Sequence, residues 1–147
     1  MDPRESPRRL RALTSHAVTL AAAQAGELAG RRVTRLGATK AAFGILAVIE
    51  EFGPSSQADL GRRLGMDRRS VSEEAARLER DGFILRAPDP ADSRRNRLEI
   101  TSPGQELLSR LDESLSALQE EFLAPLSAHE RGELDRLLAL VNRRASG

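Results

Sequence analysis

Two arginines and two serines stand within five consecutive residues at the start of a segment with helical periodicity: Arg68, Arg69, Ser70 and Ser72. A guanidinium can donate two parallel hydrogen bonds to guanine in the major groove, and a serine hydroxyl can reach bases or phosphates. The ordinary alternative is the solvated first turn of a surface helix. The elements that carry these side chains favour contact with DNA over that alternative.

The segment around these residues has the pattern helix, tight turn, helix, hairpin. A first helix is predicted to start at Ser56, which opens a Ser/Thr-x-x-Asp/Glu start signal. Gly65–Asp67 forms a short turn, Asp67 is suited to cap the next helix over 68–81, and Gly82 ends that helix. Two β-like runs and the polar loop between them follow, at 83–87, 96–101 and 88–95. The pattern predicts a winged helix-turn-helix, which places one helix in the major groove.

The charge distribution fits this prediction. Residues 60–97 carry ten arginines against seven acidic residues, whereas residues 98–147 carry five basic and nine acidic residues. The net charge of +1 for the whole chain hides this asymmetry. The positive excess therefore falls on the predicted DNA-binding segment, as contact with phosphates requires. It also argues against the alternative function, a winged-helix dimer that serves as a protein-interaction module without DNA binding.

Apolar side chains recur at three- and four-residue spacing on both sides of this unit. An N-terminal stripe covers 8–29 and is followed by a basic break over 30–37. The helix predicted over Lys40–Phe52 is apolar nearly all round, which indicates a buried central helix. Two C-terminal stripes lie over 103–122 and 127–144, behind capping boxes that begin at Ser102 and Ser127.

These stripes need a second surface to cover them. The sequence therefore predicts a mainly α fold with a small β wing, in which residues 38–101 form the DNA-binding domain. Residues 8–29 and 103–144 form a helical dimerisation region that builds a symmetric homodimer. Such a homodimer spaces its two recognition helices about one helical turn apart along the DNA.

The composition excludes several other classes. The chain has no cysteine, which excludes disulfides, thiolate metal sites and cysteine redox sensing. It has no apolar run of membrane-spanning length, and its arginine-containing start lacks the apolar core of a signal peptide, which favours a cytoplasmic protein. The only histidines, His16 and His129, stand apart, and no catalytic motif is present. We therefore expect no enzyme activity, no metal and no cofactor.

At this stage the chain resembles the MarR family of transcriptional regulators over roughly residues 8–144. Residues 92–94 followed by 98–104 resemble the family's D-x-R wing and its L/I-T-x-x-G exit, residues 57–72 its helix-turn-helix, and residues 78–84 its L-E-x-x-G exit from the recognition helix. The resemblance implies a homodimer on a pseudo-palindromic operator, commonly a repressor that a small-molecule inducer releases.

The resemblance also implies roles for individual residues. Arg94 corresponds to a minor-groove arginine of the wing and Asp92 would orient it, although a plain surface salt bridge is an alternative. Arg95 and Arg97 are expected to touch phosphates. Ser56 and Gln57, at a helix start, are expected to donate to a phosphate there.

Two further expectations concern the ligand and the recognition helix. By analogy with the family, a ligand-binding cleft is expected between the central helix and the dimer helices, near His16, Phe43 and Leu46; an ordinary interfacial role for His16 stays open. Glu73 and Glu74 depart from the family pattern. Glu73 lies four residues from both Arg69 and Arg77, so an Arg–Glu–Arg ladder along the helix is open to it. Glu73 could instead accept from cytosine N4, and a helix-stabilising ion pair is the ordinary alternative.

Overall fold

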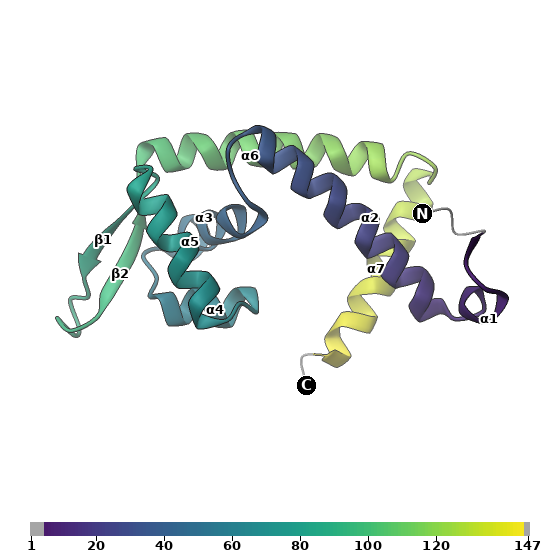
Figure 1. Cartoon of the computed structure of the whole chain (residues 1–147), viewed down its shortest axis with the longest axis horizontal. Helices are drawn as coiled ribbons and strands as arrows, with labels where there is room; N and C mark the ends of the chain where they lie inside the picture. Colours follow the sequence, from purple (N-terminus) through teal and green to yellow (C-terminus); the bar gives the residue numbers. More distant parts are fainter. Residues whose placement is uncertain (1–4, 146–147) are drawn as a thin grey trace.

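A computed structural model describes residues 5–145 of the chain (Figure 1). The described elements follow one another as helices α1 (Arg8–Arg11), α2 (Thr14–Arg35), α3 (Lys40–Phe52), α4 (Gln57–Leu64) and α5 (Arg68–Arg80), strands β1 (Ile84–Pro88) and β2 (Asn96–Ile100), and helices α6 (Ser102–Phe122) and α7 (Ala128–Ala145). The predicted fold class, mainly helical with a two-stranded wing, is confirmed.

Helices α3, α4 and α5 pack together with the β1–β2 hairpin around one apolar core. The fully buried side chains come from every part of this unit and include Ile45, Leu60, Ile84 and Leu98. The central helix is buried as predicted, and α6 adds Leu111 to the same core. Burying apolar surface of this kind is what holds the hairpin and the two helices of the helix-turn-helix in a fixed relative position.

Local hydrogen bonds start the two helices of the helix-turn-helix where the sequence predicts. The Ser56 hydroxyl accepts the backbone N–H of Asp59 at 3.1 Å. The turn between the helices passes through Gly65, whose φ of 64° is a left-handed conformation that glycine adopts without strain. β1 and β2 pair antiparallel from Ile84 opposite Ile100 to Pro88 opposite Asn96. The wing therefore stands beside the recognition helix, α5.

The N-terminal helix differs from its prediction. A short helix, α1, comes first, and α2 then runs through Gly30 without the predicted break, ending only before Gly37. The space beside Gly30 is open, so the residue costs helix stability without disrupting the helix. Arg32 holds this part of α2 against α6, because it donates to Glu121 at 2.7 Å and lies 3.4 Å from the Ser114 carbonyl oxygen.

The start of α6 also differs by one residue. Thr101, and not Ser102, caps the helix: its hydroxyl accepts the Gly104 N–H at 3.1 Å and donates to the Gly82 carbonyl at 2.7 Å. The reason is that Thr101 continues the extended backbone of β2. The second predicted capping box is confirmed, since Ser127 and Glu130 exchange hydrogen bonds of 2.9 and 3.1 Å.

Outside the winged unit, helices α1, α2, α6 and α7 extend to one side; we call these helices the arms. α6 runs away from the winged unit with α2 packed along it, and α7 turns down from the far end of α6 (Figure 1). Arg131 of α7 donates to Glu120 at 2.8 Å and holds that corner. Large apolar side chains of the arms remain exposed in the single chain: Leu10, Leu13, Val18, Leu137, Leu140 and Val141.

Candidate nucleic-acid interface

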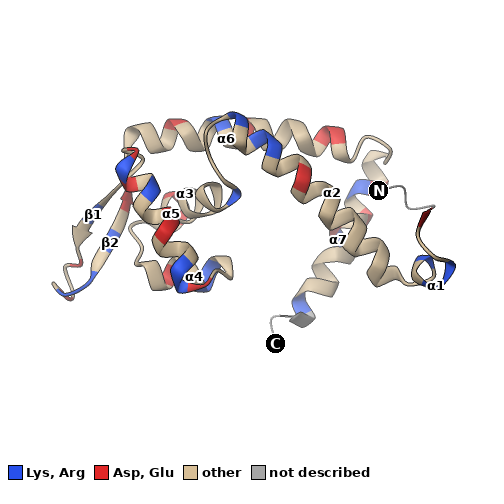
Figure 2. Cartoon of the chain, in the orientation of Figure 1, with Lys and Arg blue, Asp and Glu red and all other residues tan. Residues whose placement is uncertain are grey.

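A basic hollow of about 590 Å³ lies between the start of α4, the start of α5 and the wing. It is lined by eleven residues, of which five are arginines and none is acidic: Ser56, Gln57, Ala58, Gly61, Arg62, Met66, Arg68, Arg86, Arg94, Arg95 and Asn96. Figure 2 shows basic residues around the α4–α5 turn and along the wing. We call this hollow the basic groove. A concave surface with this charge attracts a polyanion.

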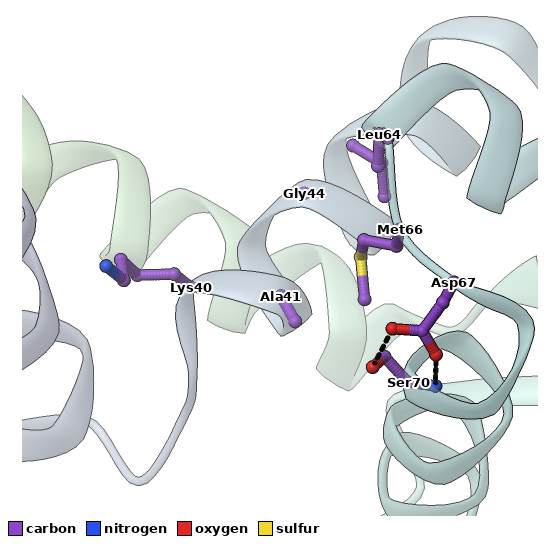
Figure 3. A pocket seen from close by; sticks show the side chains of 8 residues that line it. Lys40, Ala41, Gly44, Leu64, Met66, Asp67 and Ser70 are labelled. Carbon is purple, nitrogen blue, oxygen red and sulfur yellow. Dashed lines mark hydrogen bonds between the residues drawn. The ribbon is translucent and has the colours of Figure 1, made fainter.

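The first turn of α5 divides the four predicted α5 residues into two groups. Arg68, Arg69 and Ser72 are exposed. Ser70 instead faces α3, and its N–H and hydroxyl both donate to Asp67 at 2.8 Å (Figure 3). These bonds, the backbone one first, hold the pKa of Asp67 below its usual value. Ser70 therefore serves the helix cap in the free protein, and its hydroxyl proton is already engaged.

The two glutamates of α5 have different environments. Glu73 is exposed and accepts from Nε of Arg69 at 2.9 Å, which is the i,i+4 pair that its spacing permits. Arg77 pairs with Glu74 instead, at a longer 3.7 Å, so the ladder from Arg69 through Glu73 to Arg77 does not form. Glu74 is buried, and in the described part of the chain its Oε1 has no hydrogen-bond partner.

Two carboxylates organise the wing loop: Asp89 accepts the backbone N–H of Ala91 at 2.8 Å, and Asp92 contacts both arginines of the loop. Asp92 accepts from the backbone N–H of Arg94 at 3.0 Å and from its Nε at 3.3 Å, and Nε of Arg95 lies 3.9 Å away. The Arg94 side chain is nevertheless 91% exposed, so its remaining guanidinium donors face solvent. Arg97 lies apart from this group and donates to the Pro54 carbonyl at 3.1 Å. Its guanidinium thus holds strand β2 to the loop between α3 and α4.

Six residues of the basic groove were not predicted from the sequence, and three of them carry polar side chains: Arg62, Arg86 and Asn96. Arg62 pairs with Asp59 at 2.8 Å, and Arg86 with Glu79 at 2.9 Å. The excess of arginine over residues 60–97 was the available signal for the two arginines, but it does not say which of them share a face.

The predicted ligand residues do not come together in the single chain. His16 lies near the start of α2, where its Nε2 is 3.3 Å from the Ser6 hydroxyl, far from α3 (Figure 1). Leu46 is completely buried in the core and Phe43 packs against it. A hollow of about 520 Å³ does lie beside α3, at a different place (Figure 3). Its lining is Lys40, Ala41, Gly44, Leu64, Gly65, Met66, Asp67 and Ser70.

The described residues contain neither a membrane-spanning helix nor a cluster of metal-binding side chains. Over residues 5–145, no helix is both long and apolar enough to cross a membrane. Within the same range, no three His, Asp or Glu side chains gather as they would around a metal ion.

A recognition helix, a wing and a basic groove between them define a winged helix-turn-helix DNA-binding protein. The sequence model of the MarR family matches residues 36–95. The "Putative transcriptional regulatory protein for hcr operon" of Thauera aromatica is 35% identical over 113 residues, which cover 77% of this chain and 68% of that protein. The chain belongs to the MarR family and is a DNA-binding transcriptional regulator.

Two further proteins illustrate the similarity. The HTH-type transcriptional repressor NicR of Pseudomonas putida is 30% identical over 93 residues, 63% of this chain and 59% of NicR. The crystal structure of the PcaV transcriptional regulator from Streptomyces coelicolor with its natural ligand superposes with a TM-score of 0.80 at 26% identity, covering 95% of this chain and 99% of PcaV.

Proposed function

We propose that the protein works as a homodimer that represses transcription by binding a pseudo-palindromic operator, and that a small molecule releases it. The basic groove carries this proposal, because it lies between the start of the recognition helix and the wing and is lined by five arginines. NicR, a repressor, and PcaV, which was crystallised with its natural ligand, support the repressor and ligand parts. Since the partner is chromosomal DNA, we place its action in the cytoplasm, and we assign it no catalytic activity.

The DNA contacts divide between two grooves. Arg68, Arg69 and Ser72 project from the start of α5, which would lie in the major groove. Arg94 and Arg95 project from the wing toward the adjacent minor groove and the phosphates. Ser56 and Gln57, at the start of α4, would donate to a phosphate. Ser70, Asp92 and Arg97 would support these contacts indirectly, because their hydrogen bonds within the protein hold the helix and the wing in place.

The exposed apolar side chains of the arms support the homodimer. Leu137 is 49% exposed and Val141 is 64% exposed on α7, which has no buried side chain among residues 128–143. A contiguous apolar surface of this kind marks an interface. We therefore propose that residues 8–29 and 103–144 dimerise and that residues 38–101 read DNA.

Sedimentation of a charge variant tests the dimer. The double variant Leu137→Glu with Val141→Glu should give a folded monomer, because both side chains are exposed and their replacement leaves the winged core intact. Leu85→Glu is a matched control, since Leu85 is equally an exposed apolar residue but lies in the wing. A dimer that persists in the double variant at micromolar concentration contradicts the proposed interface.

The inducer is proposed to act between α3 and the arms. The chain has no cysteine, so a bound small molecule is favoured over thiol oxidation as the signal. Of the predicted residues, Phe43 is half-buried and Leu46 is completely buried on α3, whereas His16 lies near the start of α2 and does not meet them in the single chain. Reversible release from DNA by peroxide alone would contradict a ligand-type signal.

A DNA-binding assay tests the function as a whole. A duplex taken from upstream of the protein's own gene should be retarded in a gel, and Arg69→Ala combined with Arg94→Ala should abolish the shift. Arg110→Ala is the matched control, because Arg110 lies on α6 outside the basic groove. If the folded wild-type dimer binds no duplex at low salt, the protein-interaction module becomes the better explanation.

A further inference from the structure

Arg86 of β1 connects three elements at the wall of the basic groove. Its Nε lies 2.9 Å from Oε2 of Glu79 on α5. When the Gln57 carboxamide presents its oxygen, it accepts from Nη1 of Arg86 at 3.0 Å and from Nη2 at 3.2 Å. Gln57 is the first residue of α4, so one guanidinium joins the wing, the recognition helix and the helix before it.

These contacts fix the orientation of the Gln57 amide. A guanidinium only donates, so the amide oxygen must face Arg86. The amide is planar, and its nitrogen with two N–H donors then lies on the side away from Arg86. Gln57 and Arg86 both line the basic groove, which contains no acidic residue to compete for these donors. The donors are therefore prepared for an anion such as a DNA phosphate.

The positive charge of Arg86 is already neutralised within the protein. Its side chain is 31% exposed, against 91% for Arg94, and Glu79 neutralises it at hydrogen-bonding distance. A neutralised arginine releases no counterion when DNA binds, whereas an arginine that meets a phosphate does. The two roles therefore differ in a measurable quantity, the salt dependence of DNA binding.

We propose that Glu79, Arg86 and Gln57 form a relay in which Arg86 is a positioning residue and the Gln57 amide is the donor to a DNA phosphate. The relay rests on the proposed DNA binding. It gives Arg86 a task distinct from that of the exposed arginines around it. It also explains why an arginine paired with a carboxylate stands in the middle of a wing strand, opposite Leu98.

The test uses the full-length protein and fluorescence anisotropy at several salt concentrations. Gln57→Ala should weaken operator binding about tenfold, the size of a lost hydrogen bond to a charged group. Arg86→Lys keeps the charge but loses the forked geometry, so it should weaken binding by a similar factor with an unchanged salt slope. The double variant should bind no worse than Gln57→Ala alone, because both changes break the same interaction.

Control variants separate the relay from simple damage to the fold. Glu79→Gln loosens Arg86 without altering its side chain, and should reproduce the loss seen with Arg86→Lys even if that variant proves unstable. Arg110→Lys, outside the groove, should bind as wild type. Circular-dichroism melting of each variant checks the fold.

Three results would overturn the relay. A salt slope lowered by about one unit in Arg86→Lys would make Arg86 itself the phosphate contact. Additive losses in the double variant would show that Arg86 and Gln57 act independently. Unchanged binding in Gln57→Ala would remove the proposed donor. A wild-type protein that binds no DNA overturns the proposed function as well, so the two failures are distinguishable.

Discussion

Gly104 is the position where a single added methyl group is expected to have the largest effect. Gly104 lies in the first turn of α6, and a Cβ there would stand 2.1 Å from the Phe83 carbonyl oxygen and 2.9 Å from Cγ1 of Ile100. The Phe83 carbonyl also accepts the N–H of Thr101 at 3.1 Å. Gly104→Ala must therefore move α6 away from the base of the wing or break that hydrogen bond.

The magnitude follows from two opposing effects. Alanine is favoured over glycine in a helix by about 1 kcal/mol. Overpacking costs about 1–3 kcal/mol and sometimes more, and a backbone oxygen has no rotamer through which to escape. Because the approach of 2.1 Å is far inside van der Waals contact, the overpacking cost for Gly104→Ala lies at the upper end, about 3 kcal/mol, and we expect a net loss of about 2 kcal/mol in the free energy of unfolding. For Gly30→Ala, whose Cβ would meet nothing within 4 Å, we expect a gain of about 0.5–1 kcal/mol.

Urea unfolding followed by circular dichroism measures both variants, and anisotropy on operator DNA measures the consequence for binding. Gly104→Ala should also bind DNA more weakly, because its wing base is displaced relative to α5. The reasoning is refuted if Gly104→Ala is as stable as the wild type while Gly30→Ala behaves as expected. That outcome would mean that α6 and the wing adjust without energetic cost.

Three further outcomes are expected. Arg69→Ala should cost about 1–3 kcal/mol of binding free energy on the operator and much less on scrambled DNA. Arg94→Ala should weaken binding to both duplexes and lower the salt slope of binding by about one unit. Fluorescence anisotropy on the two duplexes measures both effects. Glu74→Met should raise the free energy of unfolding by about 1–3 kcal/mol, because it removes a buried carboxylate oxygen without a partner in the described chain; a lowered free energy of unfolding in urea contradicts this. The Asp67 carboxylate has a lowered pKa in the folded state, so its contribution is present above the unfolded pKa and is lost as pH falls through the folded value. Asp67→Asn, which still caps, should therefore flatten the acid dependence of unfolding as the pH falls through the ordinary aspartate pKa of about 3.9 and below it.

Features that depend on neighbouring residues were predictable from the sequence. The caps at Ser56, Asp67 and Ser127 follow from short-range hydrogen bonds and are present. The buried central helix follows from a segment that is apolar nearly all round, and the hairpin from two β-like runs on either side of a polar loop. Identifying the family added the candidate roles of the wing residues, which remain predictions.

Features that depend on distant partners were not predictable. The continuation of α2 through Gly30 is reinforced by Arg32, whose partners Ser114 and Glu121 lie on α6. Arg86 is a basic residue in a wing strand until the fold brings Glu79 and Gln57 to it. In both cases the interaction joins elements that no local pattern relates.

The long α6 has a mechanical consequence for operator choice. The winged unit packs at one end of α6 through Leu107, Leu108 and Leu111, and α7 is held at the other end by Arg131. A helix of 21 residues is about 32 Å long, so a tilt of about five degrees at the α7 end moves the recognition helix by about 3 Å. That displacement is close to the rise of about 3.4 Å between neighbouring base pairs. The arm would therefore act as a lever, and small rearrangements at the proposed dimer interface would change which half-site spacing the two recognition helices can match.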